Sequence, residues 1–524
     1  MKLRALLAEV DAPSVVGETD LEISGLSYDS RVVEPGFLFA ALRGRRYDGH
    51  AFIHEAVQRG AVALLVDRPV PAPAGVTTVR VAQTRRALAQ VSAAFAGHPS
   101  RRLRVVGVTG TNGKGATTYL IEAILRRAGR PCGIIGTMGI VIDGEVLPSA
   151  RTTPEAPELQ AALCVMAERS KQYVAVEVAS HALAQERTTA CRIEVAVFTN
   201  LTRDHLDFHR SVEAYRAAKA RLFAVTEPSG WAVLNADDPA SAVMRAVTPS
   251  RIMTYGLRER ADVRGRDVVL RLDGSDFVAE TPGGSVPISL RLAGGFNVAN
   301  ALAALAVGVT QDVPLGIMAE ALAAVPGIPG RFERIDEGQP FAVVVDYAHT
   351  PDGLENVLRT AREVTRGHLI TVFGCGGDRD RPKRPLMGRI AAEWSDYVIV
   401  TSDNPRTEDP LAIIEEIRRG VEEAVAARIA GGGRPDRVEV IYEPDRRRAI
   451  AAAVAAAGAG DMVVVAGKGH EAYQEIAGVR HPFDDRDVVR EVLRARSSPR
   501  ATAAWRARGP EEAPHPGDRA ARDR

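Results

Sequence analysis

Residues 105–118, VVGVTGTNGKGATT, narrow the possible folds of this chain more than any other segment. An apolar run that predicts a buried β-strand leads into a glycine-rich turn, then Lys114, then residues that favour a helix. Gly110 and Gly113 let the backbone approach a polyphosphate, while the turn amides, the helix N-terminus and the lysine attract its charge. An ordinary turn with a solvated lysine is the alternative, but the strand and helix context favours an ATP or GTP site.

The residue after Lys114 departs from the usual phosphate loop. A Ser or Thr normally follows the lysine and offers its hydroxyl to magnesium. Here Gly115 and Ala116 come first, and Thr117 follows them. Either Thr117 or a neighbouring threonine substitutes, or magnesium binding depends on other residues.

Charge and composition exclude several classes of protein. Of 524 residues, 67 are Lys or Arg and 66 are Asp or Glu, so no overall field favours nucleic acid or an anionic membrane. The N-terminal apolar stretch is too short for a signal peptide, no later run is long enough to span a bilayer, and the four cysteines form no C-x-x-C pair. We therefore expect a cytoplasmic protein with neither nucleic-acid nor membrane partners.

The pattern of apolar runs predicts three α/β domains and a tail. Residues 1–98 carry short strand-like runs and end in a polar junction, AGHPSRR. In residues 99–330, runs such as VAVEVAS alternate with helical segments, which is typical of a parallel sheet with crossover helices. Residues 331–495 begin a second alternation and predict a doubly wound domain. Residues 496–524 are poor in apolar residues and predict a disordered tail.

Polar residues follow several predicted strands, where a parallel α/β sheet places its functional groups. Glu177 ends the run VAVEV and His205 comes just after VAVFTN, so both could converge on a magnesium ion beside the phosphate loop. An unpaired carboxylate inside an apolar run would be costly, which favours a ligand role for Glu177. A zinc site at His205 and His209 is the weaker alternative, because no cysteine accompanies them.

A series of motifs over about 495 residues resembles the Mur ligase family in the family's order. The motifs are TGTNGK (109–114), EVASHAL (177–183), TNLTRDHLDFH (199–209), AYRAAKARLF (214–223), GRFER (330–334), DYAHTPD (346–352), GCGGDRD (374–380), DNPR (403–406) and GKGHE (467–471). The resemblance implies an α/β fold of three domains: an N-terminal domain for a uridine nucleotide, a central P-loop ATPase and a C-terminal Rossmann-like, doubly wound domain for an amino acid.

The resemblance also implies an activity. It points to a monomeric, cytoplasmic ligase of peptidoglycan synthesis that adds meso-diaminopimelate to UDP-N-acetylmuramoyl-L-alanyl-D-glutamate through an acyl phosphate. ATP would be the co-substrate and Mg²⁺ the cofactor. Such chemistry depends on positioning and on cations that stabilise anionic oxygens, rather than on a covalent nucleophile.

The residues that match family positions are assigned accordingly. The catalytic residues would be Lys114, Glu177, His205 and Lys219, and the metal would be held by Glu177, His205, Thr117 and Lys219 as a carbamate. ATP would contact Gly110, Thr111, Asn112, Gly113, Lys114, Gly115, Ala116, Asn297, Asn300, Arg331 and Asp346. The muramyl dipeptide nucleotide would contact Ser30, Thr152, Thr153, Ser180, Gln185 and Arg187. Diaminopimelate would contact Arg379, Asp403, Asn404, Pro405, Arg406, Gly467 and Glu471.

Two of these assignments make specific chemical demands. The helical segment around Lys219 predicts a solvated lysine from the residues alone, whereas the resemblance implies an amine that reacts with carbon dioxide and must be neutral to do so. Diaminopimelate differs from lysine by a distal carboxylate, and the planar guanidinium of Arg406 is suited to bind it in a bidentate manner. A surface arginine in an Asn-Pro turn is the alternative for Arg406.

Two other functions remain open at this stage. Folylpolyglutamate synthases share a glycine after the loop lysine, but DNPR and GKGHE have no reason to occur in a folate enzyme. A catalytically impaired homologue that only binds a nucleotide sugar would fit the missing Thr after Lys114, and also Ala179, which stands where the family usually has a serine. ATP hydrolysis that requires both other substrates would separate an active ligase from this homologue.

Overall fold

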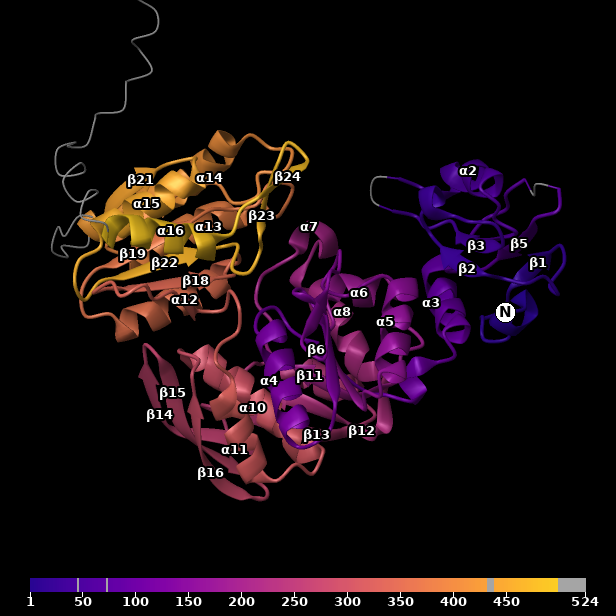
Figure 1. Cartoon of the computed structure of the whole chain (residues 1–524), viewed down its shortest axis with the longest axis horizontal. Helices are drawn as coiled ribbons and strands as arrows, with labels where there is room; N and C mark the ends of the chain where they lie inside the picture. The colour runs from indigo at the N-terminus through magenta and orange to yellow at the C-terminus, as the bar shows by residue number, and fades with distance from the viewer. Residues whose placement is uncertain (45–46, 72–73, 431–437, 498–524) are drawn as a thin grey trace, which may run out of the picture. The chain divides into compact units, whose positions relative to one another are not determined.

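The computed structural model describes residues 1–44, 47–71, 74–430 and 438–497. The chain divides into two compact units, residues 1–328 and the residues from Pro329 onward, and each is described here by itself (Figure 1). The predicted tail at 496–524 falls mostly outside the described residues, although helix α16 (Asp485–Ser497) includes its first two positions.

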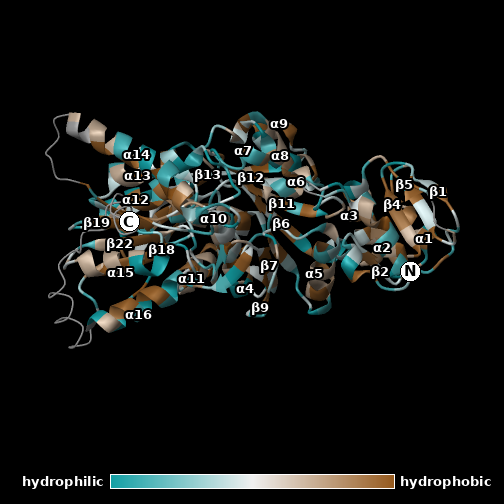
Figure 2. Cartoon of the chain, turned by 90° about the horizontal axis from the view of Figure 1, so that it is seen from above, coloured by the Kyte–Doolittle hydropathy of each residue, from teal (hydrophilic) through white to brown (hydrophobic). Residues whose placement is uncertain are grey.

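A five-stranded sheet forms the N-terminal part of the first unit, with strand order β1-β5-β4-β3-β2. Its strands are β1 (Ser14–Val16), β2 (Gly25–Ser27), β3 (Phe37–Ala40), β4 (Ala63–Val66) and β5 (Thr77–Arg80). The helical segments around it are α1 (Leu3–Leu7), η1 (Ser30–Val32), η2 (Gly49–Phe52), α2 (Ile53–Gln58) and α3 (Thr84–Phe95). Figure 2 shows β4 in the colour of apolar residues, and all four of its side chains are buried. This continuous apolar strand is typical of the centre of a parallel sheet.

The segment between α3 and the next strand is packed rather than extended. The junction predicted as a polar linker contains the short helix η3 (Pro99–Arg101), and Ser100 is buried. The hydroxyl of Ser100 accepts a hydrogen bond of 3.1 Å from the amide of Arg192. This contact ties the junction to the rest of the first unit.

An eleven-stranded sheet follows, in the order β16-β15-β14-β13-β12-β11-β6-β10-β7-β8-β9. Its strands are β6 (Arg104–Thr109), β7 (Cys132–Gly136), β8 (Gly139–Ile142), β9 (Glu145–Leu147), β10 (Tyr173–Glu177), β11 (Ile193–Phe198), β12 (Thr226–Asn235), β13 (Arg251–Gly256), β14 (Val263–Arg271), β15 (Gly274–Thr281) and β16 (Gly284–Leu290). Its helices are α4 (Lys114–Arg127), α5 (Ala156–Glu168), α6 (Ser180–Ala184), α7 (Leu206–His209), α8 (Val212–Ala224), α9 (Ser241–Val247), α10 (Gly295–Thr310) and α11 (Leu315–Ala324).

Helices cover both faces of this sheet. Val106 of β6 belongs to the core shared with α4 and α10, whereas its neighbour Val105 belongs to the core shared with α5 and α8. Successive strand residues point to opposite faces, so one short strand contributes to both cores. Helices α4 and α10 lie side by side on the first of these faces (Figure 1).

The central sheet is parallel only in its middle. Strands β7, β10, β6, β11, β12 and β13 pair in parallel, but β8, β9, β15 and β16 add antiparallel pairs at the two edges. The predicted parallel sheet with crossover helices is confirmed for the middle strands, but the sequence pattern did not predict the antiparallel pairs at the edges. The Asp143-Gly144 turn between β8 and β9, with both residues at positive φ, is a hairpin signal that the sequence already carried.

The second unit is a doubly wound domain around a six-stranded sheet in the order β17-β18-β22-β19-β20-β21. Its strands are β17 (Glu333–Arg334), β18 (Ala342–Asp346), β19 (Leu369–Phe373), β20 (Tyr397–Val400), β21 (Glu439–Tyr442) and β22 (Met462–Ala466), and β23 (Tyr473–Ile476) pairs with β24 (Val479–Pro482) in a separate ribbon. Its helices are α12 (Pro351–Val364), α13 (Lys383–Trp394), α14 (Pro410–Ala430), α15 (Arg446–Ala456) and α16. The sequence did not predict β21, an edge strand whose residues alternate in exposure instead of forming a continuous apolar run.

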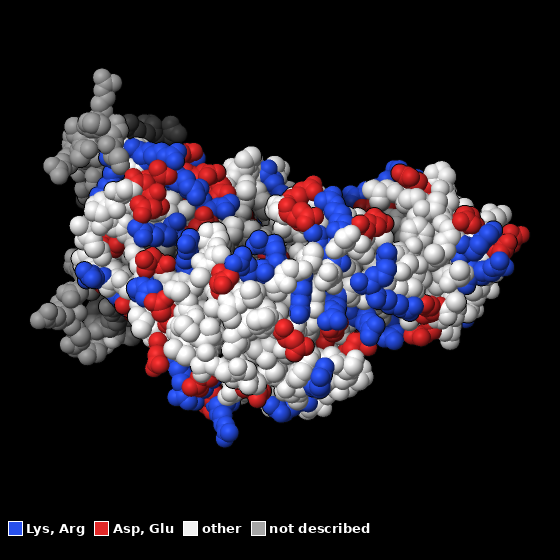
Figure 3. Space-filling view, turned by 60° about the horizontal axis from the view of Figure 1, so that its bottom comes forward, with Lys and Arg blue, Asp and Glu red and all other residues white. Residues whose placement is uncertain are grey.

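The surface matches the near-zero net charge. On the face drawn in Figure 3, acidic and basic residues lie among each other and among uncharged areas. None of the described helices combines the length and the apolar character that crossing a membrane requires.

Candidate functional site: a phosphate loop and an amino-acid pocket

The phosphate loop lies where two parallel strands end. Strand β11 pairs with β6 so that Phe198 lies beside Thr109, and the residues after each strand therefore meet. The amide of Asn112 donates to Asn200 Oδ1 at 2.9 Å, and the Thr199 hydroxyl donates to the Asn112 carbonyl at 2.6 Å. The TNLT segment thus holds the loop in shape, a role for Asn200 and Thr199 that sequence reasoning missed although it quoted their motif.

Two glycines make this loop possible. A Cβ at position 110 would lie 1.8 Å from Thr199 Oγ1, and one at position 113 would lie 2.3 Å from Asn300 Oδ1. Gly113 also has a φ of 83°, which side chains rarely adopt. Asn300 of α10, one of the residues predicted to contact ATP, therefore lies directly against the loop.

Two lysines share one carbonyl of the loop. Lys114 Nζ donates to the carbonyls of Gly110 and Thr111 at 3.1 and 2.9 Å, and Lys219 Nζ donates to Gly110 at 2.5 Å. Lys219 is only 1% exposed, and its Nζ lies 4.5 Å from the centre of the Tyr215 ring. The expectation of a solvated lysine, drawn from the residues alone, was therefore wrong.

The surroundings of Lys219 favour a neutral amine. Burial, followed by repulsion from Lys114, lowers the pKa of Lys219 well below its usual value. A helical lysine is normally on the outer face. Here α8, which Ser211 caps at its N-terminus, carries Lys219 inward toward the loop.

Glu177 lies beside the first turn of α4. Its side chain is 2% exposed, and its Oε1 accepts a hydrogen bond of 2.9 Å from the Thr137 amide. A Cβ at Gly115 would lie only 3.1 Å from Glu177 Oε1. The glycine after Lys114 therefore leaves room for this carboxylate, which gives a physical reason for the missing Ser or Thr.

The surroundings of His205 favour the neutral imidazole. Burial lowers the pKa of His205 to about 3, and the nearby His181, Lys114 and Lys219 add to this effect, although Asp204 opposes it. A neutral imidazole retains a lone pair that can bind a metal ion. Thr117, the other predicted ligand, is fully buried and donates a long hydrogen bond of 3.4 Å to Asn300 Oδ1.

These donors suit magnesium better than zinc. Within residues 1–44, 47–71, 74–430 and 438–497, no group of three or more His, Cys, Asp or Glu side chains is arranged to hold a metal ion. Mg²⁺ needs few protein ligands, because it keeps several waters and also binds substrate phosphates. One carboxylate and one imidazole beside a phosphate loop fit that pattern.

The residues predicted to bind the dipeptide are linked to Glu177. Thr153 donates to the Glu177 carbonyl at 2.7 Å, and Arg187 donates to the Thr153 carbonyl at 2.9 Å and to Gln185. Burial lowers the pKa of Arg187 to about 10. Arg187 also contacts the buried Glu155 at 3.0 Å, a partner that sequence reasoning missed.

Three further predicted residues have partners within the first unit. The Ser180 hydroxyl is 3.0 Å from His209 Nε2, and Thr152 Oγ1 is 3.1 Å from Thr137 Oγ1. Ser30 begins the short helix η1 and donates to Glu55 of α2 at 2.8 Å. Within the part of the chain that the structure describes, no hydrogen bond therefore joins Ser30 to the Thr153 and Arg187 cluster.

The residues predicted to bind an amino acid gather at the carboxyl ends of β19, β20 and β22, which are neighbours in the second sheet. Asn404 Nδ2 donates to Glu471 Oε2 at 2.8 Å, and Arg406 Nη1 donates to the Gly377 carbonyl at 2.8 Å. A Cβ at Gly467 would lie 2.5 Å from Asp403 Oδ2.

The two predicted arginines differ in how they are held. Arg406 has a φ of 53° and is 18% exposed, whereas Arg379 is exposed and donates to the Asp378 carbonyl at 3.3 Å. A Cβ at Gly376 would lie 2.8 Å from Arg406 Nη1 and 3.8 Å from Arg379 Cγ. Gly376 of the GCGG turn therefore lies next to the Arg406 guanidinium and to the first part of the Arg379 side chain. Pro405 belongs to the same turn region, since a Cβ at Gly377 would lie 1.9 Å from its carbonyl oxygen.

The remaining predicted ATP residues fall in both units. Asn297 of α10 is buried and accepts a hydrogen bond of 3.2 Å from Asn300. In the second unit, Asp346 accepts amide hydrogen bonds from Phe332 and Ala348 at 2.6 and 2.7 Å, and burial raises the pKa of its carboxyl. The Arg331 guanidinium stacks 4.6 Å from the centre of the Tyr347 ring.

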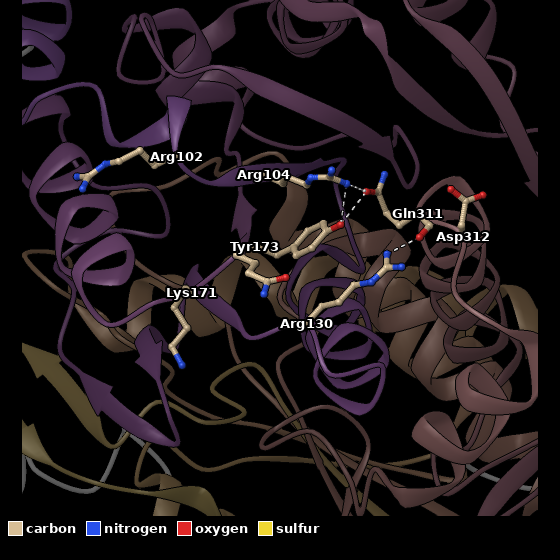
Figure 4. A pocket seen from close by; sticks show the side chains of 8 residues that line it. Arg102, Arg104, Arg130, Lys171, Tyr173, Gln311 and Asp312 are labelled. Atoms are coloured by element: carbon tan, nitrogen blue, oxygen red, sulfur yellow. Dashed lines mark hydrogen bonds between the residues drawn. The ribbon is translucent and has the colours of Figure 1, made fainter.

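A hollow of about 520 Å³ lies at the N-terminal ends of the central strands β6 and β10, opposite to the ends that carry the phosphate loop (Figure 4). Arg104 donates to the Tyr173 hydroxyl and to Gln311 there, and Arg130 donates to the Gln311 carbonyl. Basic side chains at the C-terminal ends of α4 and α10 complement the helix dipoles. None of the predicted site residues lines this hollow.

Comparisons with known families agree with this geometry. The Mur ligase middle domain matches residues 108–308, the Mur ligase glutamate ligase domain matches 330–469, and the Mur ligase family catalytic domain matches 22–96. The chain therefore belongs to the Mur ligase family, a family of ATP-dependent ligases that form carbon–nitrogen bonds. The predicted α/β architecture of three Mur ligase domains is confirmed.

Individual relatives show which kind of Mur ligase this chain is similar to. The UDP-N-acetylmuramoyl-L-alanyl-D-glutamate--2,6-diaminopimelate ligase of Syntrophomonas wolfei subsp. wolfei is 46% identical over 95% of this chain and 100% of its own length. A solved structure of a UDP-N-acetylmuramoyl-L-alanyl-D-glutamate--2,6-diaminopimelate ligase is 35% identical and matches 95% of this chain and 99% of its own with a TM-score of 0.65. The fold is also similar to that of a MurF ligase from Thermotoga maritima in complex with ADP, at 20% identity and a TM-score of 0.60 over 89% of this chain and 96% of that chain.

The contact between Gly113 and Asn300 can be tested with a matched pair of glycines. Gly113→Ala and Gly129→Ala both place alanine at a positive φ, but nothing lies within 4 Å of a Cβ at position 129. Each substitution should cost about 1–2 kcal/mol of stability. Only Gly113→Ala should also weaken binding of a non-hydrolysable ATP analogue in calorimetry, by about tenfold or more, or about 1.4 kcal/mol. Equal affinities in the two variants would contradict the role of this loop.

Proposed function

We propose that this chain is an ATP-dependent ligase that joins meso-diaminopimelate to the D-glutamate of UDP-N-acetylmuramoyl-L-alanyl-D-glutamate. The observation that carries the proposal is the likeness to ligases of that name over 95% of the chain, at 46% identity. The phosphate loop would bind ATP, and the polar cluster around Asp403 and Glu471 in the second unit would bind the amino acid, which supports the proposal.

The first step activates the D-glutamate side-chain carboxylate. One carboxylate oxygen attacks the γ-phosphorus of ATP, the bond to the β,γ-bridging oxygen breaks, and ADP leaves. The loop amides, the N-terminus of α4 and Lys114 stabilise the charge that gathers on the phosphate oxygens. Arg187, which is held by Thr153 and Glu155, would orient the dipeptide.

Mg²⁺, when bound by Glu177 and His205, would neutralise charge on the phosphates. Lys219 would complete the ligand set as a carbamate, which forms when its neutral amine attacks carbon dioxide and releases a proton. The buried amine, whose pKa is lowered, meets the condition for that reaction.

The second step forms the amide. A neutral amino group of diaminopimelate attacks the acyl phosphate carbon, the tetrahedral intermediate expels inorganic phosphate, and the nitrogen loses a proton. Asp403 and Glu471 would bind ammonium groups, and the guanidinium groups of Arg379 and Arg406 would bind carboxylates. The distal carboxylate, which lysine lacks, would select diaminopimelate.

A reconstituted reaction tests this function. Purified protein with ATP, Mg²⁺, the dipeptide nucleotide and diaminopimelate should release ADP and yield a product heavier by one diaminopimelate residue, as measured by mass spectrometry. Omitting either acceptor or amine should abolish most ADP release, and lysine should replace diaminopimelate poorly. ATP turnover that ignores both substrates, or binding without turnover, would leave the impaired homologue as the better description.

The carbamate on Lys219 has a test of its own. Lys219→Ala should reduce kcat by at least about 100-fold, because a lost electrostatic contact to transferring phosphate costs roughly 3 kcal/mol. Small carboxylic acids should restore part of the activity by occupying the space left by the carbamate. Lys171→Ala removes a lysine just before β10 begins, at the end of the strand away from the phosphate loop, and should leave kcat unchanged within about twofold. Full activity of Lys219→Ala would rule the carbamate out.

A further inference from the structure

Lys468 is a fully buried lysine in the turn after β22. Its Nζ donates to Asn404 Oδ1 at 3.1 Å and to Glu471 Oε2 at 3.3 Å, and lies 5.4 Å from the centre of the Tyr473 ring. Lysines are almost never fully buried unless they are paired. Both hydrogen-bond partners of Lys468 are residues that the resemblance to the Mur ligases assigns to the incoming amino acid.

Lys468 determines which way the Asn404 amide faces. Asn404 Oδ1 accepts from Lys468 and also from the Glu475 amide at 2.9 Å. With two donors on its oxygen, the amide must direct Nδ2 elsewhere, and Nδ2 donates to Glu471 Oε2 at 2.8 Å. Lys468, together with the Glu475 amide, thus sets the orientation of the Asn404 side chain, and Asn404 in turn holds the Glu471 carboxylate.

The local charges leave a place for one more cation. When ionised, Asp403 and Glu471 carry two negative charges, and Lys468 supplies one positive charge. The nearby Arg446 is paired with Asp485 at 2.7 Å, with both side chains 0% exposed, and Arg406 lies 3.9 Å from Glu475, so each of these arginines has an acidic partner. The cluster is therefore short of one positive charge, which an ammonium group of the amino acid would supply.

We propose that Lys468 is a positioning residue for the incoming amino acid, which presets Asn404 and Glu471 to receive an ammonium group. The proposal rests on the proposed function for the identity of that amino acid. The hydrogen bonds of Lys468 go to the side chains of Asn404 and Glu471, so the lysine acts through these two residues.

The groups around Glu471 determine how the pKa of its carboxyl should change when Lys468 is replaced. Burial, then repulsion from Asp403, raises the pKa of Glu471, while Lys468 and the Asn404 amide lower it. The Tyr347 hydroxyl also donates to Glu471 Oε1 at 3.4 Å. Without the lysine, the pKa of Glu471 should rise further, and binding of an ammonium group should then require a higher pH.

Lys468→Met tests the proposal, since methionine keeps most of the length of the side chain without its charge. The KM for diaminopimelate should rise about 10- to 100-fold, as expected for a lost charge-assisted hydrogen bond. The KM for ATP should stay within about threefold, because the phosphate loop is untouched. The acidic limb of 1/KM for diaminopimelate against pH should shift to higher pH. Lys171→Met, a lysine-to-methionine control in the first unit, should change none of these values.

A double variant separates positioning from a merely structural role. Lys468→Met with Glu471→Gln should raise the KM by less than the product of the two single effects, because the lysine acts partly through that carboxylate. The double variant removes one charge of each sign, so it serves also if Lys468→Met alone fails to fold; it should then bind diaminopimelate no more than about threefold worse than Glu471→Gln.

Three results would overturn the proposal while the wild-type enzyme remains active: an unchanged KM in Lys468→Met, an unshifted pH profile, or fully multiplicative effects in the double variant. A wild-type protein that releases no ADP with diaminopimelate would instead contradict the proposed function. The two failures are therefore distinguishable in one set of assays.

Discussion

The parallel pairing of β6 with β11 is the interaction on which the first unit's site depends. It brings Thr199 and Asn200 beside the phosphate loop, where their side chains hold the loop backbone by hydrogen bonds. The loop geometry in turn orients the Gly110 carbonyl toward Lys114 and Lys219. A shift of register between these strands would move Thr199 and Asn200 away from Asn112 and remove the hydrogen bonds that hold the loop in shape.

The second unit follows the same topological rule. Its polar turns follow β19, β20 and β22, which are adjacent and parallel, so chain segments far apart in sequence meet at one edge of the sheet. Arg446, which is buried and paired with Asp485, donates hydrogen bonds to the Ser402 and Ala466 carbonyls and so connects the segments at the ends of β20 and β22.

Much of the fold could be predicted from the sequence, because its signals are local. The apolar strand before Gly110, the glycines and Lys114 predicted a phosphate loop, and strands that are buried on both faces read as continuous apolar runs. The edge strand β21 and the antiparallel additions to the central sheet were missed, since half-exposed strands lack such runs.

The candidate site was less predictable, because burial is a property of packing. Lys219 reads as a surface residue of α8 and Lys468 as a turn residue, yet both are at most 1% exposed. Neither Glu155, which pairs with Arg187, nor Asn200, which holds the loop, carries a signal by residue type alone. These roles arise from contacts over long sequence separations, which local patterns do not report.

Oxygen-18 transfer tests the central claim most directly, namely that the phosphate loop activates a carboxylate by phosphorylation. The dipeptide nucleotide would be labelled with oxygen-18 in both oxygens of its D-glutamate side-chain carboxylate and turned over with ATP and diaminopimelate. Activation through an acyl phosphate places one labelled oxygen in each inorganic phosphate released, at a ratio of one to each amide formed. Unlabelled phosphate, released while the amide forms, would contradict the claim.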